Sequence, residues 1–467
     1  MKIGRGILAL SLLFALTAVA RASTYQVETY PTLCDAVYDE ANYTTEFLRK
    51  HWRILPGQGN WLANSSMDFP DYGNIISAQG QQELSRLTQV LANFDTQLML
   101  VYIPARGVAY PELLNAQQAG YDAALARKQY ATALENFRAQ GINVPDLTSL
   151  FAYDAPTPMF YEKDIHWSIS GAQRTAQLVA QQLDGLGLAE INAPAKYETV
   201  YNGVMLDVAN VEKAIEEICG FKFAPSYSAT YTTNELASDT ELDSFSLFDT
   251  VADEITLLGT SFSALSKFNF VGYVQEYANV PVTNYALSGG GLIGSWINYL
   301  KSGDFHAQPP RLIIWEVPGW RDFEPRFFHT ILPLFFDTCG PDDVAMQASK
   351  LTVNANQRYP NAVFDPKGSV KPARELMLQI ETDSPHIEEL QLRLWFANGG
   401  SRLYKLRHQY RTPNDGQFQT LLGENHNYPL QPVVGIDIEN TKFYSSGGEQ
   451  PSASVDVKLC SNPLPYE

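Results

Sequence analysis

Two short segments of this chain hold side chains that could act together on an acyl group. In FYEKDIHWSISGAQ (160–173), Asp164 and His166 are two positions apart, so in an extended segment both side chains point to the same side. Such a carboxylate fixes the tautomer of the imidazole and stabilises its protonated form. Ser261 lies in GTSFS, at the end of the apolar run EITLL, where a tight turn offers a hydroxyl and backbone N–H groups for a developing oxyanion.

Each segment also has a simpler interpretation that the residues alone leave open. Asp164 and His166 could form an ordinary loop ion pair, because structural pairs of this kind are common. Ser261 could be a plain helix N-cap, with Ser263 as a less well placed competitor for the nucleophile. The turn lacks the second glycine of G-x-S-x-G, so an α/β-hydrolase elbow is not supported.

Two further segments could add oxyanion or substrate contacts. Gly289, Gly290 and Gly291 come one residue after the strand-like run VPVTNYAL, and glycine allows close backbone approach to a substrate. We expect Gly290 and Gly291 to serve in this way, although a simple flexible turn is the alternative. Arg321 follows RLIIWEVP and could orient a substrate, or it could be solvated or paired with Asp322.

The elements that would position these residues alternate between strand-like and helix-like runs. Apolar strand-like runs occupy 98–104, 254–259, 280–287 and 311–318, and amphipathic helices are expected to end at Gly141 and to cover 171–187. This alternation predicts a parallel sheet with helices on both faces. The sequence 170–173 fits a capping box ahead of the second helix. Residues 197–253 lack clear periodicity and are expected to form an excursion on the rim of the sheet.

The pattern changes after Cys339, where apolar and polar residues alternate and no helix of useful length is expected. ARELMLQIETD, LQLRLWFANG, SRLYKLRHQYR and PVVGIDIEN read as strands, which predicts an all-β sandwich. We place the boundary near 340–347 and expect an α/β domain over 23–343 and a β-sandwich over 344–467.

The expected sandwich presents basic side chains on one face. Leu390, Leu392, Leu394 and Phe396 should face the core, while Arg393 and Trp395 face out. The residues expected to share the outer face of the next strand are Lys405, Arg407, Gln409 and Arg411. On an acidic chain, such a strip with an exposed Trp suggests a site for an acidic polysaccharide, and a solvated strand face is the alternative.

Charge and cysteine content indicate where the chain works. Residues 1–22 combine a short basic start, an apolar run and an Ala20-Arg21-Ala22 site, as in a cleaved signal peptide, so we expect export. The formal charge of −18 disfavours nucleic acid as a partner.

Four cysteines in an exported chain favour disulfides. Among three possible pairings we favour Cys34–Cys219 and Cys339–Cys460, because each bond then links residues within one of two consecutive parts of the chain. No spacing suggests a metal site.

Several motifs, in order and spacing, resemble the AlgX/AlgJ family of exported alginate O-acetyltransferases, which have an SGNH-hydrolase-like domain. The matching segments, between about residues 61 and 320, are GNWLANSSMDF, LVYIPARGVAYPELL, FYEKDIHWSISGA and GTSFS. Asn60 stands where the family has a glycine, and the residues after WEVP depart from its usual continuation. The resemblance implies a triad of Ser261 as nucleophile, His166 as base and Asp164 as orienting acid, without a cofactor. The β module and the cysteines suit the AlgX members.

The expectation that follows is a periplasmic O-acetyltransferase acting on an anionic polymannuronate-like polysaccharide. An SGNH-type carbohydrate acetylesterase would use the same triad, and a non-catalytic polysaccharide-binding scaffold is a third possibility. The resemblance further implies that a membrane acyl-transfer protein delivers the acetyl group and that an outer-membrane secretion complex holds this protein. We expect a monomer.

Overall fold

The computed structural model describes residues 33–72, 77–151, 158–186, 196–236, 254–336, 339–340, 342–364, 371–422, 430–444 and 451–464. The predicted signal peptide over residues 1–22 lies outside the described residues. No helix within these ranges is long and apolar enough to cross a membrane.

A parallel sheet in the order β3-β8-β6-β7 forms the centre of the first domain. Its strands are β3 (Gln97–Ile103), β6 (Ile255–Leu258), β7 (Thr283–Asn284) and β8 (Leu312–Pro318). All residues of β6 and β8 are buried, because helices cover both faces of the sheet. The prediction of a parallel sheet is confirmed, but β7 is much shorter than the expected strand over 280–287.

Helices pack on the two faces of this sheet in two separate cores. Helices α4 (Ala78–Ala92), α6 (Ala123–Ala139), α11 (Gly294–Ser302) and α13 (Pro325–Ile331) cover one face, while α7 (Ile169–Gly185) and α10 (Phe270–Ala278) cover the other. Alternate residues of β3 point into the two cores, with Leu100 in one and Val101 in the other. Shorter pieces are α1 (Glu46–Arg49), α2 (Ser65–Asp68), α5 (Arg106–Ala109), α9 (Ser261–Ala264), α12 (Asp304–Ala307), β1 (Ile54–Pro56) and β2 (Leu62–Asn64).

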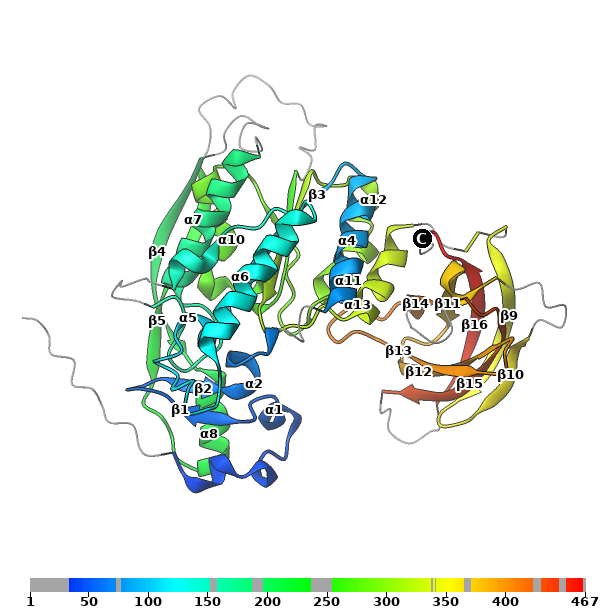
Figure 1. The fold of residues 1–467 in the computed structure, drawn as a ribbon, viewed down its shortest axis with the longest axis horizontal. Helices are drawn as coiled ribbons and strands as arrows, with labels where there is room; N and C mark the ends of the chain where they lie inside the picture. The colour runs from blue at the N-terminus through cyan, green and yellow to red at the C-terminus, as the bar shows by residue number, and fades with distance from the viewer. Residues whose placement is uncertain are drawn as a thin grey trace, which may run out of the picture.

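The segment for which we expected no regular pattern contains a long antiparallel hairpin. β4 (Lys196–Asp207) pairs with β5 (Ser226–Leu236), and α8 (Asn210–Cys219) belongs to the segment of chain that connects the two strands. The hairpin runs along the outside of α7 and α10, as Figure 1 shows at the rim of the domain. Most of its residues are at least partly exposed, so its sequence lacks the apolar alternation of a strand with one buried face. The Cys34–Cys219 disulfide ties α8 to the N-terminal segment.

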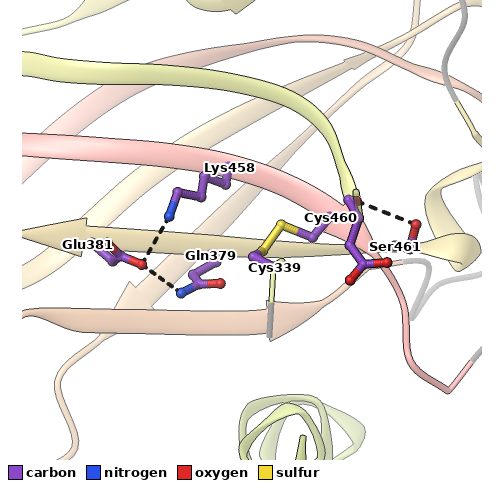
Figure 2. The surroundings of a disulfide bond; sticks show 7 residues. Cys339, Gln379, Glu381, Lys458, Cys460 and Ser461 are labelled. Atoms are coloured by element: carbon purple, nitrogen blue, oxygen red, sulfur yellow. Dashed lines mark hydrogen bonds and ion pairs between the residues drawn. A yellow bond between two sulfur atoms is a disulfide. The ribbon is translucent and has the colours of Figure 1, made fainter. Parts of the chain in front are cut away.

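The C-terminal part is a sandwich of two antiparallel four-stranded sheets, as predicted. One sheet has the order β10-β15-β12-β13 and the other β14-β11-β16-β9. The strands are β9 (Val344–Asn354), β10 (Tyr359–Phe364), β11 (Leu376–Thr382), β12 (Ile387–Phe396), β13 (Ser401–Arg407), β14 (Gln417–Leu421), β15 (Val433–Phe443) and β16 (Ser452–Ser461). The Cys339–Cys460 disulfide joins the end of β16 to the segment that enters the sandwich (Figure 2).

The two domains share part of one core. Met377, Leu421 and Cys460 of the sandwich belong to the same buried cluster as α4, α11 and α13 (Figure 1). Polar contacts cross the same boundary, where Arg86 donates to the carbonyl of Leu464 and Lys301 pairs with Asp415. The sandwich is therefore packed against the helices of the α/β domain.

Candidate functional site

A continuous chain of hydrogen bonds joins Asp164, His166 and Ser261. Asp164 Oδ1 accepts the His166 backbone N–H at 3.1 Å and lies 2.6 Å from His166 Nδ1. His166 Nε2 lies 2.7 Å from Ser261 Oγ. With Nδ1–H donating to the carboxylate, Nε2 is left as an acceptor for the serine O–H. Asp164 and His166 are buried, whereas Ser261 is partly exposed, so the nucleophilic atom lies at the accessible end of the chain.

The environment of Asp164 keeps this carboxyl ionised. Burial by itself raises its pKa, but the charge of His166 and the hydrogen bonds that His166 donates outweigh burial. Lys267 adds a smaller effect in the same direction, and the resulting pKa of Asp164 lies well below its usual range. The rings of Phe262 and Phe268 lie 4.6 Å and 5.4 Å from the imidazole centroid of His166. The imidazole is therefore held between a fixed negative charge and apolar walls.

The loop that carries the D-x-H motif (residues 160–168) is closed by backbone bonds at its base. Tyr161 N–H donates to His166 O, and Ser168 N–H donates to Met159 O. Ser168 caps α7, because its hydroxyl accepts the N–H of Gly171 at 3.0 Å. The predicted capping box beginning at Ser170 is wrong by two residues, because the helix begins at Ile169 and Ser168 takes the N-cap position.

A buried arginine that the sequence analysis did not single out supports this loop from below. Arg106 forms an ion pair with Asp68, and both side chains are fully buried. Its guanidinium also donates to the carbonyl of Leu62 in β2 and to the carbonyls of Tyr161 and Glu162 in the D-x-H loop. Arg106 therefore joins β2 and α2 to this loop. The signal available was the charged residue in PARG directly after a buried strand, where an arginine needs a carboxylate partner.

The glycine loop (residues 288–291) contacts the sandwich domain through two backbone carbonyl groups, those of Ser288 and Gly290. Gly290 N–H donates to Leu287 O, and the oxyanion or substrate role expected of Gly290 stays a prediction. Gln409 Nε2 donates to Gly290 O, and Arg411 Nη1 donates to Ser288 O. The role expected of Gly291, a partly buried residue with φ of +69°, stays a prediction.

Arg321 is exposed beyond the carboxyl end of β8. Arg321 therefore lies on the same edge of the sheet as the Ser261 turn, and its role with substrate stays a prediction.

The outer face of β12 and β13 carries the predicted basic residues, but most of their charges are paired. Arg393 pairs with Glu439, and Arg407 pairs with Glu389. The indole of Trp395 is half-buried and donates to Asp437. Lys405 is exposed and forms no ion pair within the described residues. The expectation that Gln409 and Arg411 continue this face is wrong, because β13 ends at Arg407 and both residues turn to the glycine loop.

No group of three or more histidine, cysteine, aspartate or glutamate side chains is placed to hold a metal ion within the described ranges. The side chains at Ser261 are of the types used in serine-based acyl chemistry.

Comparison with known proteins shows which family the sequence resembles. A family model described as "SGNH hydrolase-like domain, acetyltransferase AlgX" matches residues 54–319. Alginate biosynthesis protein AlgX of Pseudomonas putida is 29% identical over 94% of this chain and 91% of its own length. A protein named probable alginate O-acetylase AlgJ, from Azotobacter vinelandii, is 28% identical over 57% of this chain and 68% of its own length.

The similarity extends to three-dimensional structure and includes the sandwich. The solved structure of Pseudomonas aeruginosa AlgX matches 92% of this chain and 99% of its own length, with a TM-score of 0.76 and 25% identity. Because the family model covers more than half of the sequence, this chain belongs to the acetyltransferase AlgX family of SGNH hydrolase-like proteins.

Proposed function

We propose that this protein is an O-acetyltransferase that transfers acetyl groups to hydroxyls of an alginate-like polymannuronate through Ser261. The observation that carries the proposal is the unbroken hydrogen-bond chain from Asp164 through His166 to Ser261 Oγ. The names of the related proteins, alginate biosynthesis protein AlgX and probable alginate O-acetylase AlgJ, support both the pathway and the acetyl group.

The reaction proceeds in two acyl-transfer steps. Ser261 Oγ attacks the carbonyl carbon of the acetyl donor while His166 Nε2 takes the hydroxyl proton, and that proton then passes to the leaving group. The product of this step is an acetyl ester on Ser261. In the second step His166 takes the proton of a sugar hydroxyl, the sugar oxygen attacks the ester, and the proton returns to Ser261 Oγ. Asp164 stabilises the imidazolium formed in both steps.

An interdomain cleft supports an anionic acceptor. The cleft, between α11, α13 and strands β13 and β14, has a volume of about 490 Å³. Its basic lining residues are Lys301, Arg326, Arg402, Lys405, Arg407 and His408, and its lining within the described part of the chain includes no carboxylate. Ion pairs with residues behind the lining reduce this charge, as Lys301 pairs with Asp415. A polyuronate chain would meet cations on both walls of the cleft.

We place the reaction in the periplasm, on the basis of the predicted leader over residues 1–22. Residues 23–343 would carry the acetyl-transfer site and 344–467 the polymer-binding module, a division supported by the start of β9, the first strand of the sandwich, at Val344. An acetyl donor supplied by a membrane acyl-transfer protein, attachment to an alginate secretion complex and a monomeric state are parts of the same proposal.

The test is acetyl transfer by the purified mature protein. The protein is incubated with a chromogenic acetyl ester and mannuronate oligomers, beside Ser261→Ala and His166→Ala, and the oligomers are analysed by mass spectrometry. Addition of one acetyl mass to the oligomers, absent with both variants, supports the proposal. Ester cleavage without oligomer acetylation indicates the acetylesterase, and oligomer binding without either reaction indicates the scaffold.

A further inference from the structure

Glu316 is a fully buried carboxylic acid next to the proposed nucleophile, and the acyl-transfer steps do not use it. It lies near the end of β8, where register with β6 pairs Trp315 with Leu258. This register brings the glutamate beside the Ser261 turn (residues 259–263), which follows β6 directly. A buried carboxyl group at this position needs an explanation, because burial of such a group is costly without partners.

The partners of Glu316 are the residues on both sides of Ser261. Its Oε2 accepts the backbone N–H of Thr260 at 2.8 Å and the hydroxyl of Ser263 at 3.1 Å. The Thr260 hydroxyl donates to the same carboxyl group, at 3.1 Å from Oε1. One side chain therefore fixes the residue before Ser261 and the residue two positions after it.

Gly259 completes the same arrangement by leaving space. A Cβ at position 259 would lie 2.7 Å from Glu316 Oε2 and 3.1 Å from Glu316 Cβ. This contact is shorter than any ordinary van der Waals separation, so the carboxyl group requires glycine here for space. Three residues of the Gly-Thr-Ser-x-Ser pattern therefore contact or make room for Glu316. Gly259 leaves space for its carboxyl group, and Thr260 and Ser263 donate hydrogen bonds to it.

We propose that Glu316 is a positioning residue that holds the Ser261 turn so that Ser261 Oγ stays within hydrogen-bond distance of His166 Nε2. The inference rests on the proposed role of Ser261 as nucleophile. Glu316 acts through Thr260 and Ser263 and does not touch the reacting atoms. Its two oxygens and the three groups that donate to them form a brace whose removal frees the turn to move relative to the imidazole.

The acid-base properties of Glu316 are compatible with this role. Burial raises its pKa to about 7, against the hydrogen bonds from Thr260 and Ser263 and the influence of His166, which lower it. Because the hydroxyls of Thr260 and Ser263 can rotate, they can donate to the carboxylate or accept from the carboxylic acid. The brace therefore holds in both protonation states, and Glu316→Gln should keep most of its hydrogen bonds.

The test measures the rate at which a fluorophosphonate probe labels Ser261, followed by intact-protein mass. We expect Glu316→Ala to label about 100-fold more slowly than the native protein, as for a reacting group displaced by about 1 Å. Glu316→Gln should label close to the native rate. Glu83→Gln is the matched control, since Glu83 is a buried carboxylate paired with Arg86 and His329 and should leave labelling unchanged.

A second pair of variants tests the contact with Gly259 and guards against a general loss of folding. Gly259→Ala should slow labelling in the native background, because its methyl group displaces the carboxyl group. It should have little further effect in Glu316→Ala, where that group is absent. Native-rate labelling of Glu316→Ala, equal slowing by Glu316→Gln, or a full effect of Gly259→Ala in both backgrounds would each overturn the inference.

Crystal structures of the native protein and Glu316→Ala decide the point even if Ser261 does not react. Failure of the native protein to label would contradict the proposed function and leave the positioning question to these structures. A Ser261 Oγ to His166 Nε2 distance beyond hydrogen-bond reach in Glu316→Ala supports the brace. The native distance of 2.7 Å in that variant would overturn it.

Discussion

The D-x-H loop and the outer face of β12 and β13 each contain a buried carboxylate with cationic partners, and the two differ in where the partners come from. Asp164 accepts hydrogen bonds from the backbone N–H and from Nδ1 of His166, two residues away. Glu389 takes its bonds from Gln391, from Arg407 on β13 and from Lys442 on β15. In the loop one carboxylate organises one imidazole beside a nucleophile. On the sandwich one carboxylate neutralises cations that would otherwise be available to a polyanion.

The difference teaches that a short spacing in sequence identifies a reactive pair better than a strip of like charge identifies a binding face. The contact between Asp164 and His166 depends only on the conformation of one short loop. A strip of basic residues depends on what neighbouring strands place beside it. Replacing Asp164 should therefore affect chemistry, and replacing a sandwich cation should affect binding weakly.

The largest effect is expected for Asp164→Asn. The amide offers an N–H in place of a carboxylate oxygen, so His166 loses the group that fixes its tautomer and stabilises its charged form. We expect kcat for acetyl transfer to fall by about 10⁴-fold. Glu46→Gln, at an exposed carboxylate, is the control and should retain full activity. A loss smaller than about tenfold would mean that Asp164 is an ordinary loop partner.

The next effect concerns the support below the loop. Arg106→Ala leaves Asp68 as an uncompensated buried charge and should lower the free energy of unfolding by about 3–5 kcal/mol, measured by urea denaturation. The exposed pair of Arg326 and Glu324 gives the matched control, because Arg326→Ala should cost about 0–1 kcal/mol. Equal effects of the two variants would contradict the role of Arg106 as a buried hub.

The pH dependence of stability should have opposite sign at two buried carboxyl groups. The pKa of Glu316 is raised to about 7, so the folded state binds its proton more tightly and stability is lost as pH rises from about 4.5 to 7. Glu316→Gln should remove this loss, as measured by thermal unfolding across that range. A native protein and variant with parallel stability profiles over that range would contradict the assignment.

Glu389 gives the opposite case on the sandwich. Burial alone raises its pKa, but hydrogen bonds from Gln391, Lys442 and Arg407 lower it to about 2. Its contribution to stability is present above about pH 4.5 and is lost as pH falls toward 2. Glu389→Gln should therefore destabilise the protein at neutral pH and approach the native stability in acid. A deficit independent of pH would show that packing, rather than charge, holds this residue.

The smallest effect is expected for polymer binding. Lys405→Ala should weaken binding of mannuronate oligomers a few-fold, about 0.5–1 kcal/mol, and reduce its dependence on salt, because this cation is exposed and unpaired within the described residues. Titration calorimetry at two salt concentrations measures both quantities. Lys196→Ala, at the start of the distant hairpin, is the control. An unchanged affinity for Lys405→Ala would contradict a role of this cleft residue in polymer binding.

The sequence predicted the fold where hydrophobic pattern decides it. Runs such as LMLVYIP and RLIIWEVP are apolar throughout because both faces of the central sheet are covered, and β12 alternates because one face is solvated. The exposed hairpin of β4 and β5 was missed because neither pattern applies to it. The two disulfides agree with the favoured pairing.

The site was predictable only as far as its residues are local in sequence. Asp164, His166 and Ser261 were predicted from two sequence motifs, D-x-H and G-T-S, and hydrogen bonds join the three side chains in the structure. Arg106 and Glu316 were not singled out, because their partners lie dozens of residues away. The contact between Gly290 and Gln409 could not be predicted, because it depends on how the two domains pack.

The most direct test of the account is detection of the acyl-enzyme. The native protein is mixed rapidly with an activated acetyl ester, quenched in acid and digested, and the peptides are analysed by mass spectrometry. We predict one acetyl group on Ser261 in the native protein, which disappears when mannuronate oligomers are added before the quench, and no acetylated peptide in Ser261→Ala. Acetyl transfer that persists in Ser261→Ala, or an acetyl group on a different residue, would contradict the central claim.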